Sequence, residues 1–184
     1  MAAAQAAGEW DELGVELGEA GAGLRKAGSE ALLIASNTMH CLVQSIETRS
    51  GLPVLHIADA TGRALQDKGC RAPLLLGTRF TMEQDFYRRR LQTQFGLEVV
   101  CPDEAGRARV HQVIYDELCQ GVILDESRDA LRQIIAQTLP QGVDSVILGC
   151  TELGMILSSC DELPPIFDTT ALHVGMALDW MTLA

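Results

Sequence analysis

The sequence predicts an α/β protein with a parallel sheet, and two of its patterns support this fold class. Short, mainly apolar runs at 31–35, 73–76 and 145–148 are typical of strands that are covered on both faces. Segments with apolar residues at helical spacing lie between these runs. Strands that alternate with helices form a parallel sheet wrapped by helices on both faces. The 184 residues have room for one ordinary domain or two small lobes.

The predicted elements follow one another in a repeated order. Apolar residues at helical spacing predict a first helix over 8–27, which Gly28 ends. The strand at 31–35 comes next, and residues of helix-capping types follow it at 36–38. Shorter strands are predicted at 54–56, 97–100 and 166–167. Further helices are predicted over 81–94, 107–119, 126–139 and 169–181, with another helical stretch after residue 150.

The composition excludes several classes of function. There are 14 Lys and Arg residues against 25 Asp and Glu, and the formal net charge is −11. Such a chain has no basic stripe that could neutralise a phosphate backbone. No apolar run approaches the roughly 20 residues that span a bilayer, and the start of the chain fits neither a signal peptide nor a transit peptide. We therefore expect no nucleic-acid partner and no membrane contact.

The chain is large enough to bury its own core, so its six cysteines do not indicate a disulfide scaffold. They form no Cys-x-x-Cys pair, so they do not indicate a structural zinc site either. We expect a cytoplasmic location, with most cysteines acting as small buried hydrophobic residues. Cys150 differs because it follows an apolar strand and precedes a predicted helix start. A helix N-terminus lowers the pKa of a thiol, which is about 8.5 in free cysteine, and makes it a usable base. The alternative, that Cys150 only fills a tight turn, stays open.

Two strand ends repeat the same pattern of residue types. The sequence L-I-A-S-N at 33–37 and the sequence L-G-C-T-E at 148–152 each end in a small residue, a hydroxyl residue and a polar residue. Ala35 and Cys150 are counterparts in this pattern. Ligands of open α/β sheets bind in the crevice outside the carboxyl ends of the strands. We therefore expect the two turns to face each other across such a crevice.

Four motifs occur in order along the chain: A-S-N-T-M-H at 35–40, L-H-I-A-D-A-T at 55–61, L-G-T-R-F-T-M-E at 76–83 and G-C-T-E at 149–152. Together they resemble the motif set of the aspartate/glutamate racemase superfamily, above all its bacterial broad-specificity amino-acid racemase branch. The resemblance implies two pseudo-symmetric lobes within 1–184. Residues 1–55 and 165–184 would form the first lobe, and 56–164 the second. Family members usually begin with an apolar strand and a glycine-rich loop that this sequence lacks before Gly8, so the first lobe is expected to be incomplete.

The resemblance implies a cofactor-independent racemase with no metal, which acts on a small amino acid as a homodimer. One cysteine takes the α-proton from one face of the substrate, and a second cysteine returns a proton from the other face. The second family cysteine matches Cys150, whereas the first falls on Ala35. Racemisation needs an acid and a base on opposite faces, and a methyl group is neither. We therefore expect impaired or one-sided activity, with Ser36 and His40 as weak substitutes for the absent thiol.

The resemblance also assigns substrate contacts to seven positions, which are Ser36, Asn37, Thr38, Thr78, Arg109, Thr151 and Glu152. The turn at 36–38 matches the family segment that holds the substrate carboxylate, and Thr78 caps a neighbouring strand in the same manner. Arg109 falls where the family has a cation for the substrate, although an exposed charge in the first turn of a helix is the alternative. Thr151 and Glu152 are expected to position Cys150 and the substrate ammonium.

Two other functions stay open at this point. One is a cofactor-free decarboxylase of the same superfamily, in which a lone thiol protonates one face of a carbanion-like intermediate. The absence of a thiol at Ala35 suits that chemistry. The other is a non-catalytic remnant that binds small carboxylates without turnover.

Overall fold

The computed structural model of the protein describes residues 2–157 and 163–183, so Cys160 lies outside the described residues. Its strands are β1 (Leu32–Leu33), β2 (Val54–Leu55), β3 (Pro73–Gly77), β4 (Ser145–Gly149) and β5 (Ile166–Asp168). Its α-helices are α1 (Ala2–Ala7), α2 (Trp10–Lys26), α3 (Val43–Ser50), α4 (Ile57–Asp67), α5 (Arg79–Glu83), α6 (Asp85–Phe95), α7 (Glu104–Gln112), α8 (Asp125–Thr138) and α9 (Thr169–Leu183). Strands alternate with helices along most of the chain, which confirms the predicted α/β class.

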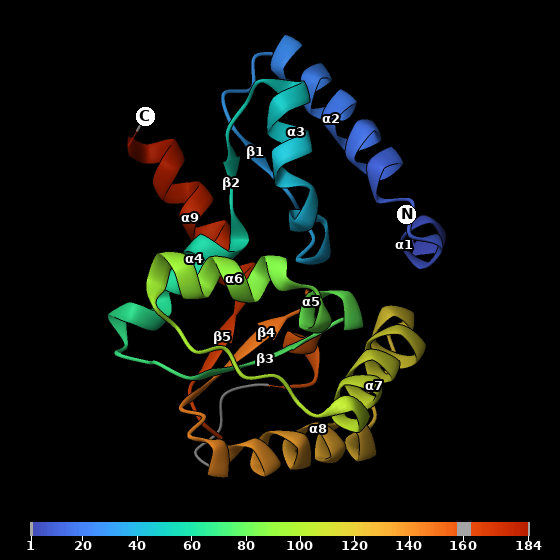
Figure 1. Ribbon diagram of the computed structural model, residues 1–184, viewed down its shortest axis with the longest axis vertical. Coiled ribbons are helices and arrows are strands. Elements are labelled where there is room, and N and C mark those ends of the chain that lie inside the picture. The colour runs from blue at the N-terminus through green and yellow to red at the C-terminus, as the bar shows by residue number, and fades with distance from the viewer. Residues whose placement is uncertain (1, 158–162, 184) are drawn as a thin grey trace.

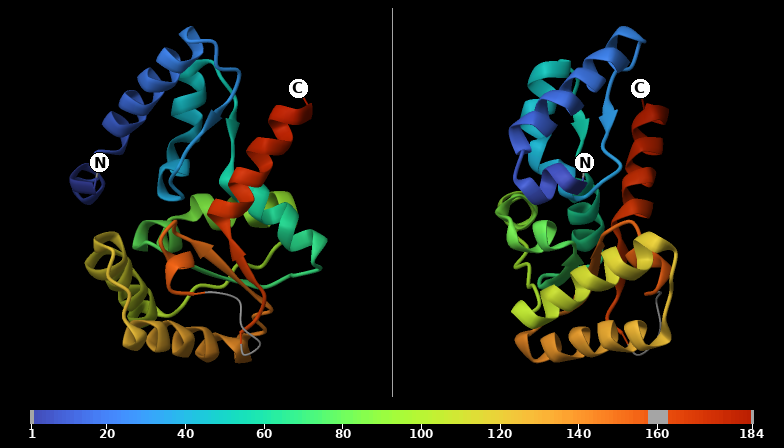
Figure 2. Two further views of the ribbon diagram at one scale, coloured as in Figure 1. Left: turned by 180° about the vertical axis from the view of Figure 1, so that it is seen from behind. Right: turned by 90° about the vertical axis from the view of Figure 1, so that its right-hand side faces the viewer.

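The strands form two separate parallel sheets. One sheet pairs β1 with β2, and the other has the order β3-β4-β5. Figure 1 shows the two-stranded sheet beside α2 and α3, and the three-stranded sheet between α6 and α8. The views in Figure 2 show α9 running from the end of β5 back toward the two-stranded sheet. The predicted lobe boundary at 164/165 precedes β5, which pairs with β4 and so belongs to the three-stranded sheet.

The larger core surrounds β3 and β4, in which every residue is buried. Helices on both faces of these strands contribute apolar side chains, including Leu65 of α4, Leu91 of α6 and Leu131 of α8. A strand covered on both faces has no polar side, which explains the uninterrupted apolar runs in the sequence. This core holds the carboxyl ends of β3 and β4 in place.

The two-stranded sheet is covered differently. Leu32 of β1 packs with Ile46 and Leu52 in a small core beside α2 and α3. Successive side chains of a strand point to opposite faces, and Leu33 is 43% exposed. The expectation that the run at 31–35 is covered on both faces is therefore wrong, because the described helices α2 and α3 cover only one face of it.

Three predicted elements in the middle of the chain differ from the structure. The predicted helix over 81–94 is interrupted at Gln84, whose extended backbone separates α5 from α6. The predicted strand at 97–100 forms one isolated bridge, between Val100 and Leu74. The predicted helix over 107–119 begins earlier, at Glu104, because Asp103 caps its N-terminus by accepting a hydrogen bond from the Gly106 N–H. It then ends in a wider π-helical turn over Val113–Glu117.

No helix among the described residues combines the length and the apolar character of a membrane span.

Candidate active site

A cavity of about 220 Å³ lies at the carboxyl ends of the strands, where the sequence predicts a crevice. It brings together both turns of the repeated pattern, and Ala35 and Cys150 both line it. All predicted contact residues except Arg109 also line it. The full lining is Gln5, Ala35, Ser36, Asn37, Thr38, Thr78, Ile114, Tyr115, Cys119, Gly149, Cys150, Thr151 and Glu152.

The close approach of two strand ends places Thr78 next to Cys150. Gly77 at the end of β3 pairs with Gly149 at the end of β4. A Cβ atom at Gly77 would lie 2.9 Å from the Gly149 carbonyl oxygen, closer than such atoms approach each other in proteins. Glycine at both positions therefore lets the two backbones come together and directs the residues that follow into one cavity.

Three threonine hydroxyls join the turn at 36–38 to the segment that follows β3. The Thr38 Oγ1 atom lies 3.0 Å from Thr78 Oγ1 and 3.1 Å from Thr81 Oγ1, and the last two atoms are also 3.1 Å apart. All three residues are buried. Because each hydroxyl has one proton and two lone pairs, the triangle can rearrange its donors when a ligand binds. It fixes the turn at 36–38 against the end of β3.

Asn37 offers an unused hydrogen-bond acceptor. Thr169 donates its hydroxyl proton to the Leu148 carbonyl, so its oxygen accepts the bond from Asn37 Nδ2 at 3.0 Å. The NH₂ group of the Asn37 amide therefore faces Thr169. Asn37 is only 4% exposed, and its Oδ1 atom has no partner among the described residues. A buried acceptor without a partner is costly, so a water molecule or a ligand is expected to donate to it.

Cys150 and Glu152 form a hydrogen-bonded pair. The Cys150 thiol donates to Glu152 Oε2 at 2.9 Å, and the Thr151 hydroxyl donates to the same oxygen at 2.6 Å. Burial acts to raise the pKa of the Glu152 carboxyl, but these two hydrogen bonds, together with one from the Glu152 backbone N–H, outweigh burial and hold the pKa below its usual value. Glu152 is therefore ionised at neutral pH and accepts a hydrogen bond from the thiol.

The expectation of a lowered thiol pKa at Cys150 is wrong. Burial raises this pKa well above the value of a free cysteine, and the hydrogen bond to Glu152 raises it further. In the described chain, residues after Cys150 form only the short 3₁₀ turn Leu153–Met155 in place of the predicted helix. No α-helix N-terminus therefore favours the thiolate at this position. Cys150 is a neutral thiol at pH 7, with a carboxylate in contact with its proton.

Arg109 does not reach the cavity. Its guanidinium donates to Ser127 Oγ at 3.0 Å and to Gln112 Oε1 at 3.1 Å, and it lies 3.5 Å from a Glu117 carboxylate oxygen. The residue lies in the last turn of α7 and ties that helix to α8. Arg109 therefore has a structural role in place of the expected contact with the substrate. It is also not an exposed charge in the first turn of a helix, which was the alternative.

Sequence reasoning missed two side chains with chemistry in the cavity, Tyr115 and Cys119. They are four residues apart, and that spacing places two side chains on one face of a helix. Most cysteines were expected to be buried, but among the described cysteines only Cys150 is buried, and Cys119 is exposed. Partial burial of the Cys119 thiol, together with the Glu152 charge, raises its pKa. The π-helical turn that carries Tyr115 leaves no clear signature in the sequence.

Three buried histidines pack against one another, and one of them, His40, contacts the turn at 36–38. The ring centroid of His40 lies 4.6 Å from that of His56 and 5.5 Å from that of His173. Burial is the main cause that lowers the pKa of all three, to about 4 for His40 and about 2 for His56. The nearby Arg90 charge lowers the values for His40 and His56 further. The cluster is therefore uncharged at neutral pH.

Lowering the pH from 7 to 5 is expected to reduce the free energy of unfolding. The unfolded chain takes up protons at His40 and His56 near pH 6.5, whereas the folded protein does so only near the lowered pKa values. The free energy of unfolding therefore stays constant above about pH 6.5 and falls below that pH, by about 2 kcal/mol for each histidine at pH 5. Urea unfolding at pH 7, 6 and 5 measures the change. The variant His40→Asn should show a smaller slope, and a flat profile for the unchanged protein would contradict the prediction.

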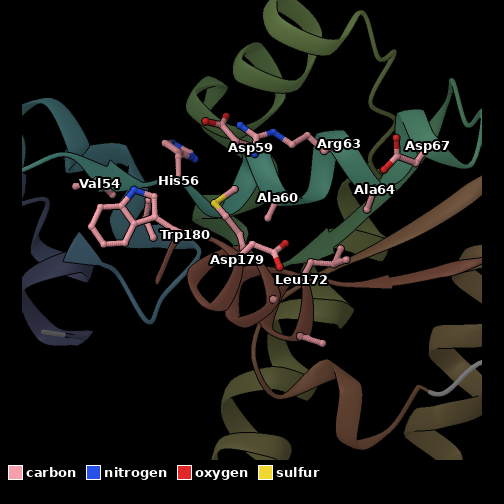
Figure 3. Close-up of a pocket in the computed structure, with 14 residues that line it drawn as sticks. Val54, His56, Asp59, Ala60, Arg63, Ala64, Asp67, Leu172, Asp179 and Trp180 are labelled. Carbon is pink, nitrogen blue, oxygen red and sulfur yellow. The ribbon is translucent and has the colours of Figure 1, made fainter. Parts of the chain in front are cut away.

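A second cavity, of about 550 Å³, lies between α4 and α9. Figure 3 shows His56 and Asp59 on one side of it and Asp179 and Trp180 on the other. It shares no lining residue with the cavity at Cys150 and contains no cysteine. The smaller cavity, with its thiol and carboxylate pair, is therefore the candidate active site.

Comparisons with known proteins agree with this geometry. A family model described as Asp/Glu/hydantoin racemase matches residues 1–177. The broad-specificity amino-acid racemase RacX of Bacillus subtilis is 28% identical over 148 residues, which cover 80% of this chain and 63% of that protein. The chain thus spans less than two thirds of the length of this relative.

Two solved structures are similar over nearly the whole chain. A putative Asp/Glu racemase from Yersinia pestis has 43% identity and a TM-score of 0.90, and the match covers 97% of this chain and 78% of that one. An aspartate racemase homologue from Pyrococcus horikoshii has 31% identity and a TM-score of 0.83, with 94% and 76% covered. The fold, the paired turns and the family match lead to one conclusion: the chain belongs to the Asp/Glu/hydantoin racemase family.

Proposed function

We propose that this protein moves the α-proton of a small amino acid without a cofactor, with Cys150 as the acid and base on one face of the substrate. The observation that carries this proposal is the contact of 2.9 Å between the Cys150 thiol and the Glu152 carboxylate inside a cavity. The relative from Bacillus subtilis carries the name of a broad-specificity amino-acid racemase, which supports the same reaction class.

The proton can move in two steps on one face of the substrate. The thiol first passes its proton to Glu152, and the resulting thiolate removes the hydrogen from the α-carbon, whose bonding pair stays on the carbon. The thiol exchanges this proton with water, returns a proton to the same carbon, and then takes its own proton back from Glu152, which restores the starting pair. Acid and base groups placed in this way contribute about 10²–10⁴-fold to a rate. The raised pKa of Cys150 suits the return step, because a neutral thiol is the proton donor.

The opposite face of the substrate is expected to lack such a group. Ala35 lines the cavity at the counterpart position, and its methyl group neither donates nor accepts a proton. The proposed activity is therefore a one-sided form of amino-acid racemisation. It exchanges the α-proton with solvent and returns it mainly to the face from which it came.

The charges around the cavity favour an amino acid over a malonate-type substrate. The described lining residues include the Glu152 carboxylate and no Lys or Arg. An ammonium group can donate to Glu152 and to the free Asn37 Oδ1 atom, whereas the two carboxylates of a malonate would be repelled by Glu152. The substrate carboxylate is left to the hydroxyls and the backbone N–H groups of the turn at 36–38. This argument places the racemase above the decarboxylase.

We also propose a cellular location and an oligomeric state for the protein. The five described cysteines are free, as is common in a reducing compartment, so we place the protein in the cytoplasm. We also propose that it acts as a homodimer. Size-exclusion chromatography with light scattering gives the mass that tests this second point.

Incubation with single enantiomers in deuterated water tests the proposed function. We expect loss of the α-proton signal in proton NMR, with little of the opposite enantiomer in chiral chromatography. Exchange with rapid inversion would instead show a complete racemase. No exchange with any amino acid would favour the non-catalytic remnant, and release of carbon dioxide from a malonate would favour the decarboxylase.

A further inference from the structure

His40 joins the turn of the candidate site to the start of α4. It is 2% exposed, and its Nδ1 atom lies 2.7 Å from the Ser36 carbonyl oxygen. On the other side of the ring, Nε2 accepts a hydrogen bond from the Ile57 N–H at 3.1 Å. One buried side chain thus connects two segments that are about 20 residues apart in the sequence.

These two partners fix the tautomer of His40. The Ile57 N–H is a donor, so Nε2 has no proton and accepts. The Ser36 carbonyl is an acceptor, so the single ring proton is on Nδ1 and is donated to it. Both hydrogen bonds require the same neutral form of the ring, which is the form that burial favours.

The bond to the Ser36 carbonyl also orients the next peptide group. In a planar trans peptide the C=O and the following N–H point in opposite directions. When His40 holds the Ser36 carbonyl toward α4, the Asn37 N–H is directed away from His40. That N–H makes no hydrogen bond within the described part of the chain, and both Ser36 and Asn37 line the cavity.

We infer that His40 is a positioning residue, which holds the Ser36–Asn37 peptide so that the Asn37 N–H can bind the carboxylate of the substrate. This inference rests on the proposed function for the identity of the ligand. It concerns a residue that does not line the cavity and that acts only through the peptide it holds. The expected effect is therefore on substrate binding more than on the chemical step.

Two substitutions separate the two hydrogen bonds of His40. In His40→Asn the side-chain nitrogen is two bonds from Cβ, as Nδ1 is, so it can still donate to Ser36. In His40→Gln the amide is three bonds from Cβ, as Nε2 is, so it can accept from Ile57 but not reach Ser36 in the same way. We expect KM for α-proton exchange to rise about tenfold in His40→Gln, with kcat changed less than threefold. His40→Asn should keep KM within about twofold.

His173→Asn is the matched control. His173 belongs to the same buried cluster, and its Nε2 atom lies 2.6 Å from the Leu55 carbonyl oxygen, but it makes no hydrogen bond to the turn. It should lower the thermal midpoint and leave KM unchanged. Equal KM values in His40→Gln and His173→Asn, or equal losses in both His40 variants, would overturn the inference.

A substrate-free measurement separates this inference from the proposed function. The amide signal of Asn37 in a ¹⁵N–¹H NMR spectrum is expected to shift in His40→Gln and to stay in place in His40→Asn and His173→Asn. An unshifted signal in His40→Gln would contradict the role of His40 whatever the enzyme activity. Absence of exchange in the unchanged protein, combined with the expected shift, would refute the proposed function alone.

Discussion

Cys150→Ala is expected to lower the rate of α-proton exchange about 10³-fold, the largest loss of any single substitution in the chain. The thiol is the proposed donor and acceptor of the substrate proton, and a positioned acid or base contributes about 10²–10⁴-fold. Glu152 remains ionised in this variant, but it loses the group through which it acts. The measurement is the initial rate of α-proton loss in deuterated water, followed by proton NMR for each enantiomer.

Cys101→Ala is the control for this substitution. Cys101 is half-buried like other cysteines of the chain and packs against the larger core, where its thiol donates to the Met82 carbonyl oxygen. It does not line the cavity. We expect the rate of exchange to stay within about twofold in Cys101→Ala. Equal rates in Cys150→Ala and in the unchanged protein would remove Cys150 from the mechanism.

The meeting of the two turns was predictable from the sequence. The predicted runs contain β1 (Leu32–Leu33) and β4 (Ser145–Gly149), which are strands of two separate parallel sheets, and short polar residues occur soon after each strand. Parallel strands carry their following loops at the carboxyl ends, where ligands bind in this class of fold. Ala35 and Cys150 are counterparts in the repeated pattern, and both line one cavity, as that pattern predicted.

The protonation state of Cys150 was not predictable in the same way. It depends on how deeply the thiol is buried and on the direction of the Glu152 side chain, and both are set by tertiary packing. The sequence suggested a helix start, whose dipole would favour the thiolate. The described chain makes only a 3₁₀ turn at Leu153–Met155, so no helix dipole lowers the pKa of the thiol. Burial and the nearby Glu152 carboxylate raise it.

The position of Arg109 shows a second limit of sequence reasoning. The prediction of its helix began three residues too late, because the capping role of Asp103 was not recognised. Successive side chains of an α-helix are about 100° apart around its axis. The π-helical turn after Gln112 changes this spacing, and Tyr115 and Cys119, which lie in and after it, line the cavity. Arg109 instead meets Ser127 of α8.

The segments that follow β4 and β1 contribute different groups to the cavity. The segment that follows β4 supplies the proton-transferring pair, Cys150 and Glu152. The segment that follows β1 supplies Asn37 with its free acceptor and the turn that His40 holds. In the proposed function, the turn after β1 binds the substrate, and it carries the Ala35 methyl group where a second thiol would be needed for inversion.

Ala35→Cys is expected to convert one-sided exchange into racemisation and to raise the rate of inversion about 10²-fold or more. Ala35 already lines the cavity together with Cys150, so a thiol there would face the substrate without a change of the backbone. With a thiol on each side, one can remove the α-proton while the other delivers a proton to the opposite face. Chiral chromatography of the product from a single enantiomer measures the rate of inversion.

The double variant Ala35→Cys with Cys150→Ala makes this test specific for geometry. It keeps a single thiol in the cavity but moves it to the other turn, so the enantiomer that exchanges its α-proton fastest should be the opposite one. Ala136→Cys adds a thiol at an exposed position of α8, away from the cavity, and should change neither the rate nor the preferred enantiomer. If the double variant kept the preference of the unchanged protein, the two turns would not act on opposite faces of the substrate, because only their arrangement across the α-carbon connects the position of the thiol to the handedness of the amino acid.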